Sequence, residues 1–251
     1  RRRDHGDARL LRDPGQRTGV AAHATAGQLD DEGERVRLAQ RGQLGGDGGA
    51  VVAATGWYYE PFHPPEVADT DTGALADLLV RDITHGLDGT GVLPGVIGEV
   101  GSHGEAPSGP ERRTLAASAR AAVETGLSLT THAQLGRGGL AQLELLTGEG
   151  LAPHRVCVGH QDLLDDSAAH KELASRGAYL AFDTVGKEGY QSDEARLRLL
   201  LALLEAGYAD HVLLSCDISR HGYLRAEGGQ GYGHLFRSFL PRLREAGADE
   251  D

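Results

Sequence analysis

The chain has 251 residues, of which 39% are hydrophobic, and its formal net charge is −12 at pH 7. This length and composition are sufficient for one large α/β domain with a substantial core. The negative charge and the lack of a long Lys/Arg cluster argue against nucleic acid or an anionic membrane as a partner, and favour a small-molecule substrate.

The sequence contains no signal for membrane insertion or secretion. No run approaches the roughly 18 to 20 consecutive apolar residues of a spanning helix, and the N-terminus has no apolar signal-peptide core. We therefore expect a cytoplasmic protein without a membrane partner, which could form a homodimer. The only cysteines, Cys157 and Cys216, fall in predicted buried strands, so we expect free thiols and no disulfide.

Residues 1–50 differ in composition from the rest of the chain. They contain nine Arg, eight acidic residues and ten Gly, but only seven Leu or Val and no Ile, Phe, Tyr or Trp. Such a segment buries too little apolar surface to offset its chain entropy. We therefore predict an atypical segment over residues 1–50, disordered or foreign to the domain, and one folded domain over residues 51–251.

From Val51 onward, short apolar runs alternate with longer amphipathic stretches. The predicted strands are residues 51–55, 95–100, 127–132, 155–160, 178–183 and 211–217. The predicted helices are residues 71–86, 110–125, 137–149, 165–176, 191–207 and 232–246. This alternation indicates a parallel sheet covered by helices, either a (β/α) barrel or an open doubly wound sheet.

Four potential metal ligands favour the barrel. Glu99, His132, His160 and Asp217 each lie at or next to the carboxyl end of a separate predicted strand. A barrel brings these strand ends together on one face, whereas an open sheet would spread them apart. The pattern therefore predicts a (β/α)8 TIM-type barrel with a metal site.

Each ligand also has a structural interpretation. One histidine at a strand end is most often structural, but His132 and His160 on adjacent strands would form a pair suited to zinc, cobalt, manganese or iron. Glu99 lies inside an apolar strand and needs a cation, which could be a metal or an arginine. Asp217 could bind metal and accept a proton, or it could cap a helix. We interpret Asp183, at a similar strand end, as structural.

A Gly-rich stretch at residues 228–233 does not indicate nucleotide binding. It lacks the Lys-Ser/Thr pair of a P-loop and has no strand directly before it. We interpret it as a loop, and we disfavour a nucleotide-binding doubly wound fold.

Several stretches between Val51 and Gly247 resemble the phosphotriesterase family of the amidohydrolase superfamily, most closely its phosphotriesterase homology protein branch. The stretches are Val51 to Tyr59, Gly98 to Gly101, Thr131-His132, Val158 to Leu163, Phe182 to Lys187 and Leu214 to Ile218. The resemblance implies a (β/α)8 barrel that binds two divalent metal ions, usually zinc. The recognisable strands would be strands three to eight, with the first two β/α units absent or aberrant.

The resemblance also implies a role for each ligand. Glu99 matches the bridging carboxylate, His132 and His160 match the ligands of the more exposed metal, and Asp217 matches a ligand of the buried one. Asp183 matches a position that is not a ligand. The family completes the buried site with a His-x-His pair on its first strand, whereas residues 1–50 contain only His5 and His23, neither on a strand-like run.

The expected reaction is the hydrolysis of an ester-type bond by a metal-activated hydroxide. By resemblance, Asp217 would accept the proton, and Tyr58 and Tyr59 would lie near the substrate. The family hydrolyses lactones, carboxylic esters and phosphotriesters, and similarity to the homology-protein branch favours a lactone or a carboxylic ester. The alternative is a non-catalytic remnant that lacks the His-x-His half of the site.

Overall fold

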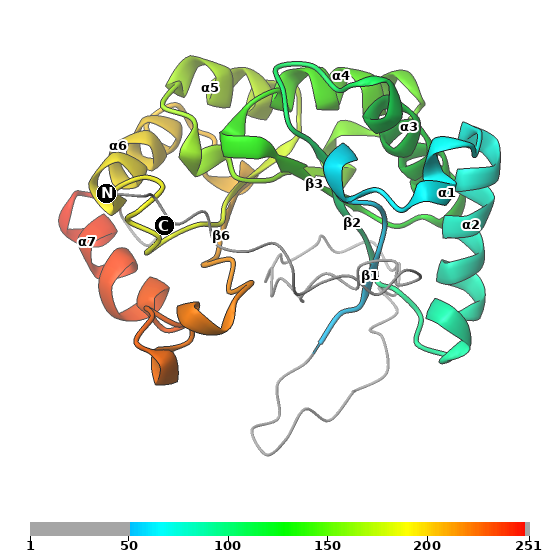
Figure 1. Ribbon diagram of the computed structural model, residues 1–251. Helices are drawn as coiled ribbons and strands as arrows, with labels where there is room; N and C mark the ends of the chain where they lie inside the picture. The colour runs from blue at the N-terminus through cyan, green and yellow to red at the C-terminus, as the bar shows by residue number, and fades with distance from the viewer. Residues whose placement is uncertain (1–50, 249–251) are drawn as a thin grey trace, which may run out of the picture.

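The computed structural model describes residues 51–248, which form one curved parallel sheet flanked by helices (Figure 1). Its six strands are β1 (Ala54–Thr55), β2 (Val96–Ser102), β3 (Leu129–Ala133), β4 (Val156–Val158), β5 (Tyr179–Phe182) and β6 (Val212–Leu214). They lie in the sheet in chain order, and each neighbouring pair is parallel.

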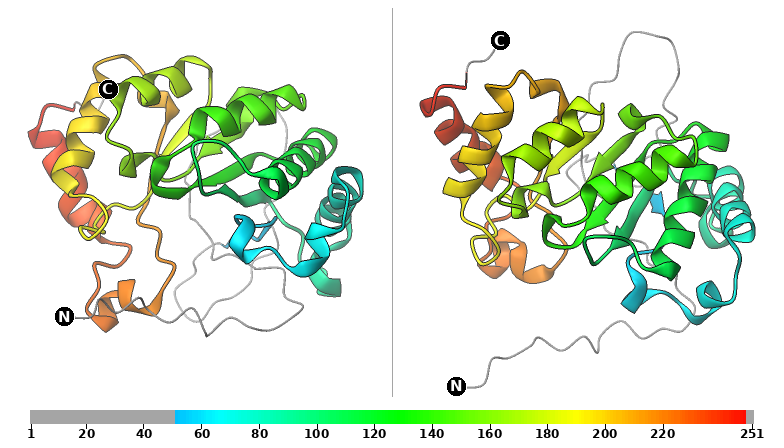
Figure 2. Two further views of the ribbon diagram at one scale, coloured as in Figure 1. Left: turned by 45° about the horizontal axis from the view of Figure 1, so that its top comes forward. Right: turned by 90° about the horizontal axis from the view of Figure 1, so that it is seen from above.

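Helices make most of the connections, as parallel strands require crossovers. The longer ones are α2 (Thr72–His85), α3 (Gly109–Thr125), α4 (Gly139–Gly148), α5 (Ser167–Ser175) and α6 (Asp193–Leu204). A single turn, α1 (Pro65–Ala68), precedes α2, and a π-helical turn (Leu235–Phe239) leads into α7 (Leu240–Glu245). The helices follow the convex side of the sheet as an arch (Figures 1 and 2).

This arrangement confirms the barrel-type fold for the described β/α units. A doubly wound sheet reverses its strand order and carries helices on both faces, whereas here the order is sequential and the helices lie on one side. The doubly wound alternative is therefore wrong. The interpretation of residues 1–50, including His5 and His23, falls outside the described residues.

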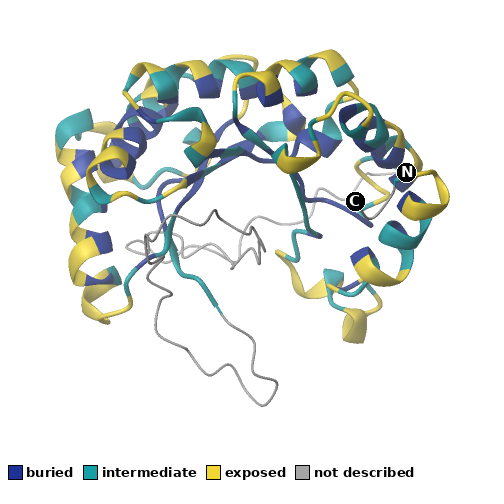
Figure 3. Cartoon of the chain, turned by 180° about the vertical axis from the view of Figure 1, so that it is seen from behind, coloured by how far each residue is buried: buried dark blue, intermediate teal, exposed yellow. Residues whose placement is uncertain are grey.

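The core lies between the sheet and the helices. The helix faces that contact the sheet are buried and their outer faces are exposed (Figure 3). On α3, for example, Leu115, Ala119 and Ala122 are fully buried, and on the sheet Ile97 and Leu129 are at most 1% exposed. Burial of this continuous apolar layer stabilises the packing of the helices against the sheet.

Helix ends follow local signals in the sequence. The Ser108 hydroxyl accepts a hydrogen bond from the Glu111 amide, and the Glu111 carboxylate accepts one from the Ser108 amide, which together form a capping box at the start of α3. Gly126 in the left-handed conformation ends the same helix. Asp71 caps α2 by accepting from two backbone amides.

The structure differs from the sequence prediction in small ways. The sequence did not indicate α1, the strand predicted at residues 51–55 contains only the two residues of β1, and the last predicted helix divides into a π-helical turn and α7. Cys157 and Cys216 are free thiols, as expected. Among the described residues, no helix is both long and apolar enough to cross a bilayer.

An irregularity in β2 positions Glu99. The register of β2 against β3 shifts between Ile97 and Val100, so Gly98 and Glu99 occupy a bulge. Gly98 has a φ of 145°, and a Cβ added there would lie 2.5 Å from the Thr130 carbonyl oxygen. Because only glycine allows this close approach, residue 98 sets where Glu99 enters the site.

We predict that Gly98→Ala destabilises the fold by about 1 to 3 kcal/mol, because the added methyl group must displace β3. The matched control is Gly109→Ala, since Gly109 has no φ restriction and an added Cβ would meet nothing within 4 Å. The control should stay within about 0.5 kcal/mol of the parent. Urea midpoints measure both variants, and equal midpoints would show that β2 and β3 tolerate a side chain here.

Candidate active site

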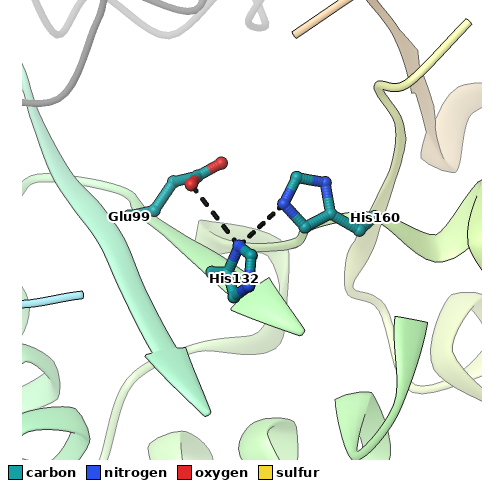
Figure 4. Close-up of side chains that lie close together, drawn as sticks. All are labelled: Glu99, His132 and His160. Carbon is teal, nitrogen blue, oxygen red and sulfur yellow. Dashed lines mark hydrogen bonds and ion pairs between the residues drawn. The ribbon is translucent and has the colours of Figure 1, made fainter. Parts of the chain in front are cut away.

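Three of the predicted ligands converge at the carboxyl ends of adjacent strands (Figure 4). Glu99 lies in β2, His132 in β3, and His160 follows β4, and each is between 4% and 7% exposed. One ligand atom of each lies within 4.8 Å of the others. His132 Nδ1 is 2.7 Å from His160 Nε2 and 3.7 Å from Glu99 Oε2. The strand ends thus meet as the barrel model predicted.

Hydrogen bonds on the outer nitrogens define the tautomers of the two histidines. His132 Nε2 is 2.6 Å from the Gln134 Oε1 atom, and His160 Nδ1 is 2.7 Å from the Asp183 Oδ1 atom. Both partners are acceptors, so each imidazole donates its N–H outward. The remaining nitrogens, His132 Nδ1 and His160 Nε2, therefore face each other with their lone pairs, as metal-binding histidines do.

Two lone pairs this close repel each other unless a cation lies beside them. Burial lowers the pKa of His160, but the Asp183 carboxylate outweighs burial, and with Glu99 and Asp217 it raises that pKa to about 10. The surroundings therefore stabilise positive charge at this place, either a proton or a metal ion.

The donor set fits a divalent ion. A tetrahedral site with bonds of about 2.0 to 2.1 Å separates its ligand atoms by about 3.3 Å. The two separations at His132 Nδ1, 2.7 Å and 3.7 Å, bracket that value. Two imidazoles and one carboxylate also form a ligand set that zinc accepts. Glu99, His132 and His160 could therefore hold one metal ion.

The structure does not bring Asp217 into this cluster. Its Oδ2 atom accepts a hydrogen bond from the Lys187 ammonium, which also lies 4.3 Å from the centre of the Tyr223 ring. Asp217 nevertheless lines the same cavity of about 160 Å³ as His132 and His160. Its position beside the site agrees with the sequence, while its part in metal binding stays a prediction.

The described residues do not complete a second metal site. Asp217 and the carboxylate of Glu99 are the only predicted ligands that residues 51–248 offer to a second ion, and Lys187 already contacts Asp217. Two carboxylates are fewer than the three protein ligands of a typical catalytic zinc site. The described residues therefore offer the ligands of one ion.

Tyr58 and Tyr59 flank His132. The Tyr58 hydroxyl lies 3.0 Å from His132 Nδ1, and the Tyr59 ring stacks on the imidazole with an interplanar angle of 13°. Burial, reinforced by the charge of Glu99, raises the pKa of Tyr58 above its usual value. Its phenol therefore stays protonated and can donate a hydrogen bond. Both tyrosines line the cavity, and contact with a substrate stays a prediction.

A buried ion pair lies behind the site. The Arg196 Nε atom donates to Asp162 Oδ2 over 2.6 Å, and both side chains are fully buried. Asp162 Oδ1 also accepts from the Asp183 amide, and Oδ2 accepts from the Thr184 amide and hydroxyl. Arg196 donates in turn to the Thr184 hydroxyl and to Asp193. The network joins the segment after β4 to the end of β5 and to α6.

This network positions His160 through Asp183. Asp183 accepts hydrogen bonds from both the backbone amide and the Nδ1–H of His160. Because Asp162 binds the backbone of Asp183, the orientation of the imidazole depends on the buried ion pair. His160 itself has a φ of 57°, an uncommon conformation for a residue other than glycine, and these contacts help to hold it.

Sequence reasoning missed several of these residues. Asp183 lies outside the cluster of Glu99, His132 and His160, and the sequence does not predict its contact with His160. Lys187 ends one of the stretches that resemble the phosphotriesterase family, but a single lysine after a strand does not by itself indicate a role in a site. Arg196 lies in a helix with other charged residues, which is typical of a solvated face. Only the Asp at position 162, two residues after His160, could have suggested a polar support.

The chain is similar in sequence and in fold to known proteins. A model of the phosphotriesterase family matches residues 44–251. The chain belongs to the phosphotriesterase family. It is 40% identical over 197 residues to the phosphotriesterase homology protein of Escherichia coli strain K12, covering 78% of this chain and 68% of that protein.

Solved structures and other relatives agree. The crystal structure of the Escherichia coli phosphotriesterase homology protein, complexed with phosphate in its active site, aligns with a TM-score of 0.78 at 39% identity and covers 80% of this chain and 69% of that one. A lactonase from Listeria monocytogenes aligns with a TM-score of 0.75 at 27% identity, and the alignment covers 80% of this chain and 68% of that one. The N-acetyltaurine hydrolase of Mus musculus is 30% identical.

The chain spans about two thirds of the length of these relatives. The match to the Mus musculus hydrolase covers 80% of this chain but only 60% of that protein. The chain thus belongs to a hydrolase family, and it matches its relatives over only part of their length.

We predict that Arg196→Met destabilises the protein by about 3 to 5 kcal/mol, because it leaves the Asp162 charge buried without its partner. Arg198→Met is the matched control on the same helix. Arg198 pairs with Asp165, and both side chains are more than half exposed, so its loss should cost at most about 1 kcal/mol. Chemical denaturation measures both variants, and similar midpoints would contradict a structural role for the buried pair.

Proposed function

We propose that this chain is a metal-dependent hydrolase of ester-type bonds that prefers lactones and carboxylic esters to phosphotriesters. The observation that carries the proposal is the pair of facing nitrogens, His132 Nδ1 and His160 Nε2, beside the Glu99 carboxylate. This arrangement needs a cation, and its donors suit zinc, with manganese, cobalt or iron as alternatives.

A bound divalent ion would supply a Lewis acid and lower the pKa of a water molecule. The chain's own residues would do the rest. Glu99, His132 and His160 would hold the ion. Asp217, which lines the cavity and is oriented by Lys187, would accept the proton of the attacking water at a carboxylate oxygen.

Tyr58 would act as a hydrogen-bond donor to the substrate. Its phenol lies against His132 and its raised pKa keeps it protonated. A neutral donor at this place can bind the carbonyl oxygen of the ester and favour the charge that develops on it. Tyr59, stacked on the same imidazole, would form an apolar wall of the cavity.

The size of the cavity supports the preference for small esters. Its volume is about 160 Å³, below the roughly 300 to 1,000 Å³ of typical sites for drug-sized ligands. A lactone or a short carboxylic ester fits this space better than a phosphotriester with three substituents. The named activity of one structural relative, a lactonase, also supports this choice.

One observation favours a second candidate, a metal-binding protein without catalytic activity. The Lys187 ammonium contacts Asp217, and residues 51–248 supply the ligands of one ion only. If catalysis requires two ions, the described residues bind metal without turning over substrate.

Metal analysis and a substrate panel test the proposal. The full chain is stripped with a chelator, reloaded with zinc, manganese or cobalt, and assayed on a lactone, an aryl acetate and a dialkyl aryl phosphate. We expect at least one ion per chain and hydrolysis of the first two substrates. His160→Asn should lose the ion and reduce activity at least about 100-fold. Replacing a metal ligand is expected to reduce activity more than replacing a residue that hydrogen-bonds to that ligand.

His154→Asn is the control, because His154 is exposed and lies just before β4, away from the cavity. It should keep both metal and activity. A parent chain that binds no metal would refute the proposal, and one that binds metal but hydrolyses no member of the panel would favour the non-catalytic candidate.

A further inference from the structure

Tyr58 and Tyr59 lie beyond the end of β1, and the strand itself does little to hold them. β1 contains only Ala54 and Thr55, and its register with β2 is limited to these two residues. The Tyr58 hydroxyl nevertheless has a defined place, 3.0 Å from His132 Nδ1 in the candidate site. Contacts outside the sheet must therefore fix the segment that carries the two tyrosines.

The chain turns sharply after the tyrosines. The Phe62 amide donates to the Tyr59 carbonyl oxygen over 2.9 Å, and the His63 amide donates to the Glu60 carbonyl oxygen over 3.0 Å. Pro64 restricts the residue before it to extended conformations, and His63 has a φ of −65° and a ψ of 133°. The turn therefore brings the His63 side chain back toward the start of the segment.

The His63 ring holds the backbone of Tyr58. Its Nε2 atom lies 2.7 Å from the Tyr58 carbonyl oxygen, and because a carbonyl oxygen only accepts, this nitrogen carries the proton and donates. Burial lowers the pKa of His63, so the ring is neutral at pH 7. Its Nδ1 atom is buried and has no hydrogen-bond partner within residues 51–248. The bond to Tyr58 is therefore the one hydrogen bond that this ring makes to the described residues.

Glu111 holds the same segment at a second point. Its fully buried carboxylate accepts a hydrogen bond from the Glu60 amide over 3.3 Å and one from the Ser108 amide over 2.9 Å. His103 Nδ1, which follows β2, lies 2.6 Å from the same carboxylate. Glu111 therefore joins the segment after β1 to the end of β2 and to the start of α3.

Between these two contacts, the tyrosines pack on the strand ends. A Cβ added at Gly101 of β2 would lie 3.1 Å from the Tyr59 amide nitrogen and 3.2 Å from His132 Cβ, so the segment lies close against β2 and β3. The Phe62 ring centre is 5.4 Å from that of Tyr58 and 5.0 Å from that of Tyr59. The packing leaves the rings in contact with His132, and the hydrogen bonds of the segment set how far along the site the Tyr58 hydroxyl lies.

We propose that His63 and Glu111 are positioning residues of the reaction, which hold the backbone around Tyr58 so that its hydroxyl meets the substrate beside His132. The inference rests on the proposed hydrolase function, in which Tyr58 donates to the substrate. Neither His63 nor Glu111 lines the cavity, so both act through the segment and not by touching substrate. A donor that stabilises developing charge must be placed accurately, and a displacement of about 1 Å can reduce the rate about 100-fold.

Two substitutions of His63 test this inference in the metal-loaded full chain. His63→Leu removes the donor, whereas His63→Gln offers an amide N–H near the position of Nε2. For a lactone or aryl ester that the parent hydrolyses, we expect His63→Leu to lower kcat at least about 10-fold, with KM within about threefold and bound metal unchanged. His63→Gln should restore kcat to within about threefold of the parent, because it keeps the hydrogen bond.

His211→Leu is the matched control. His211 Nδ1 donates to the Ala178 carbonyl oxygen over 2.9 Å, which is the same kind of contact, but His211 lies just before β6 and does not line the cavity. Its replacement removes a histidine-to-carbonyl bond at the opposite end of the strands. It should therefore keep kcat within about twofold of the parent.

Glu111→Gln tests the second contact. It removes the charge that accepts three hydrogen bonds, and it should lower kcat in the same way as His63→Leu, with metal content unchanged. Glu172→Gln is its control, because Glu172 pairs with Arg176 on the surface of α5 and both side chains are 48% exposed. If Glu111→Gln keeps the kcat of the parent, Glu111 has no part in positioning Tyr58.

Trp57 reports the position of the segment independently of activity. It is the only tryptophan of the chain, it directly precedes Tyr58, and it is 3% exposed. In His63→Leu we expect its emission to move to longer wavelength and acrylamide to quench it more strongly, because water reaches the indole when the segment is released. His63→Gln and His211→Leu should keep the spectrum of the parent.

The outcomes separate the two proposals. If His63→Leu keeps the kcat of the parent, or if His63→Gln loses as much kcat as His63→Leu, the positioning inference is wrong and the hydrolase function stands. If the parent hydrolyses no substrate, the hydrolase function fails, and the Trp57 spectra then decide. A shift in His63→Leu but not in His63→Gln would support the hold on Tyr58, and equal spectra would refute it.

Discussion

The ion pair between Arg196 and Asp162 is the constraint on which the site depends. A parallel sheet brings strand ends to one face, but it does not by itself orient the side chains that follow them. Here a fully buried guanidinium neutralises Asp162, which in turn binds the amides of Asp183 and Thr184. The charges are expensive to bury, so the pair is best explained by the geometry that it enforces.

The buried ion pair fixes the orientation of one imidazole, that of His160, through one carboxylate, that of Asp183. Asp183 binds His160 at both its amide and its Nδ1 atom, which directs the Nε2 lone pair toward His132. On the other side Gln134 does the same for His132. With the ring nitrogens of His132 and His160 facing each other, the surroundings favour a positive charge here, either a proton or a metal ion. The geometry that could hold a metal ion therefore depends on the surrounding hydrogen bonds as well as on Glu99, His132 and His160.

Much of this could be predicted from the sequence, for physical reasons. All six described strands and the five long helices were predicted, because apolar periodicity and helix ends are local signals. Glu99, His132 and His160 were identified because polar residues that end apolar strands are conspicuous. Arg196 and Lys187 were not, since a charged residue that is buried by tertiary contacts has the same local pattern as an exposed one.

Three carboxylates around two imidazoles would be redundant if their environments were alike, and they are not. Asp183 binds an imidazole N–H, Glu99 faces the ring nitrogens from a bulge, and Asp217 meets an ammonium. Different partners give chemically identical groups different tasks. Lys187 extends this division, because the same ammonium that orients Asp217 also lines the cavity. A substitution of Lys187 would therefore change both the partner of Asp217 and the lining of the cavity.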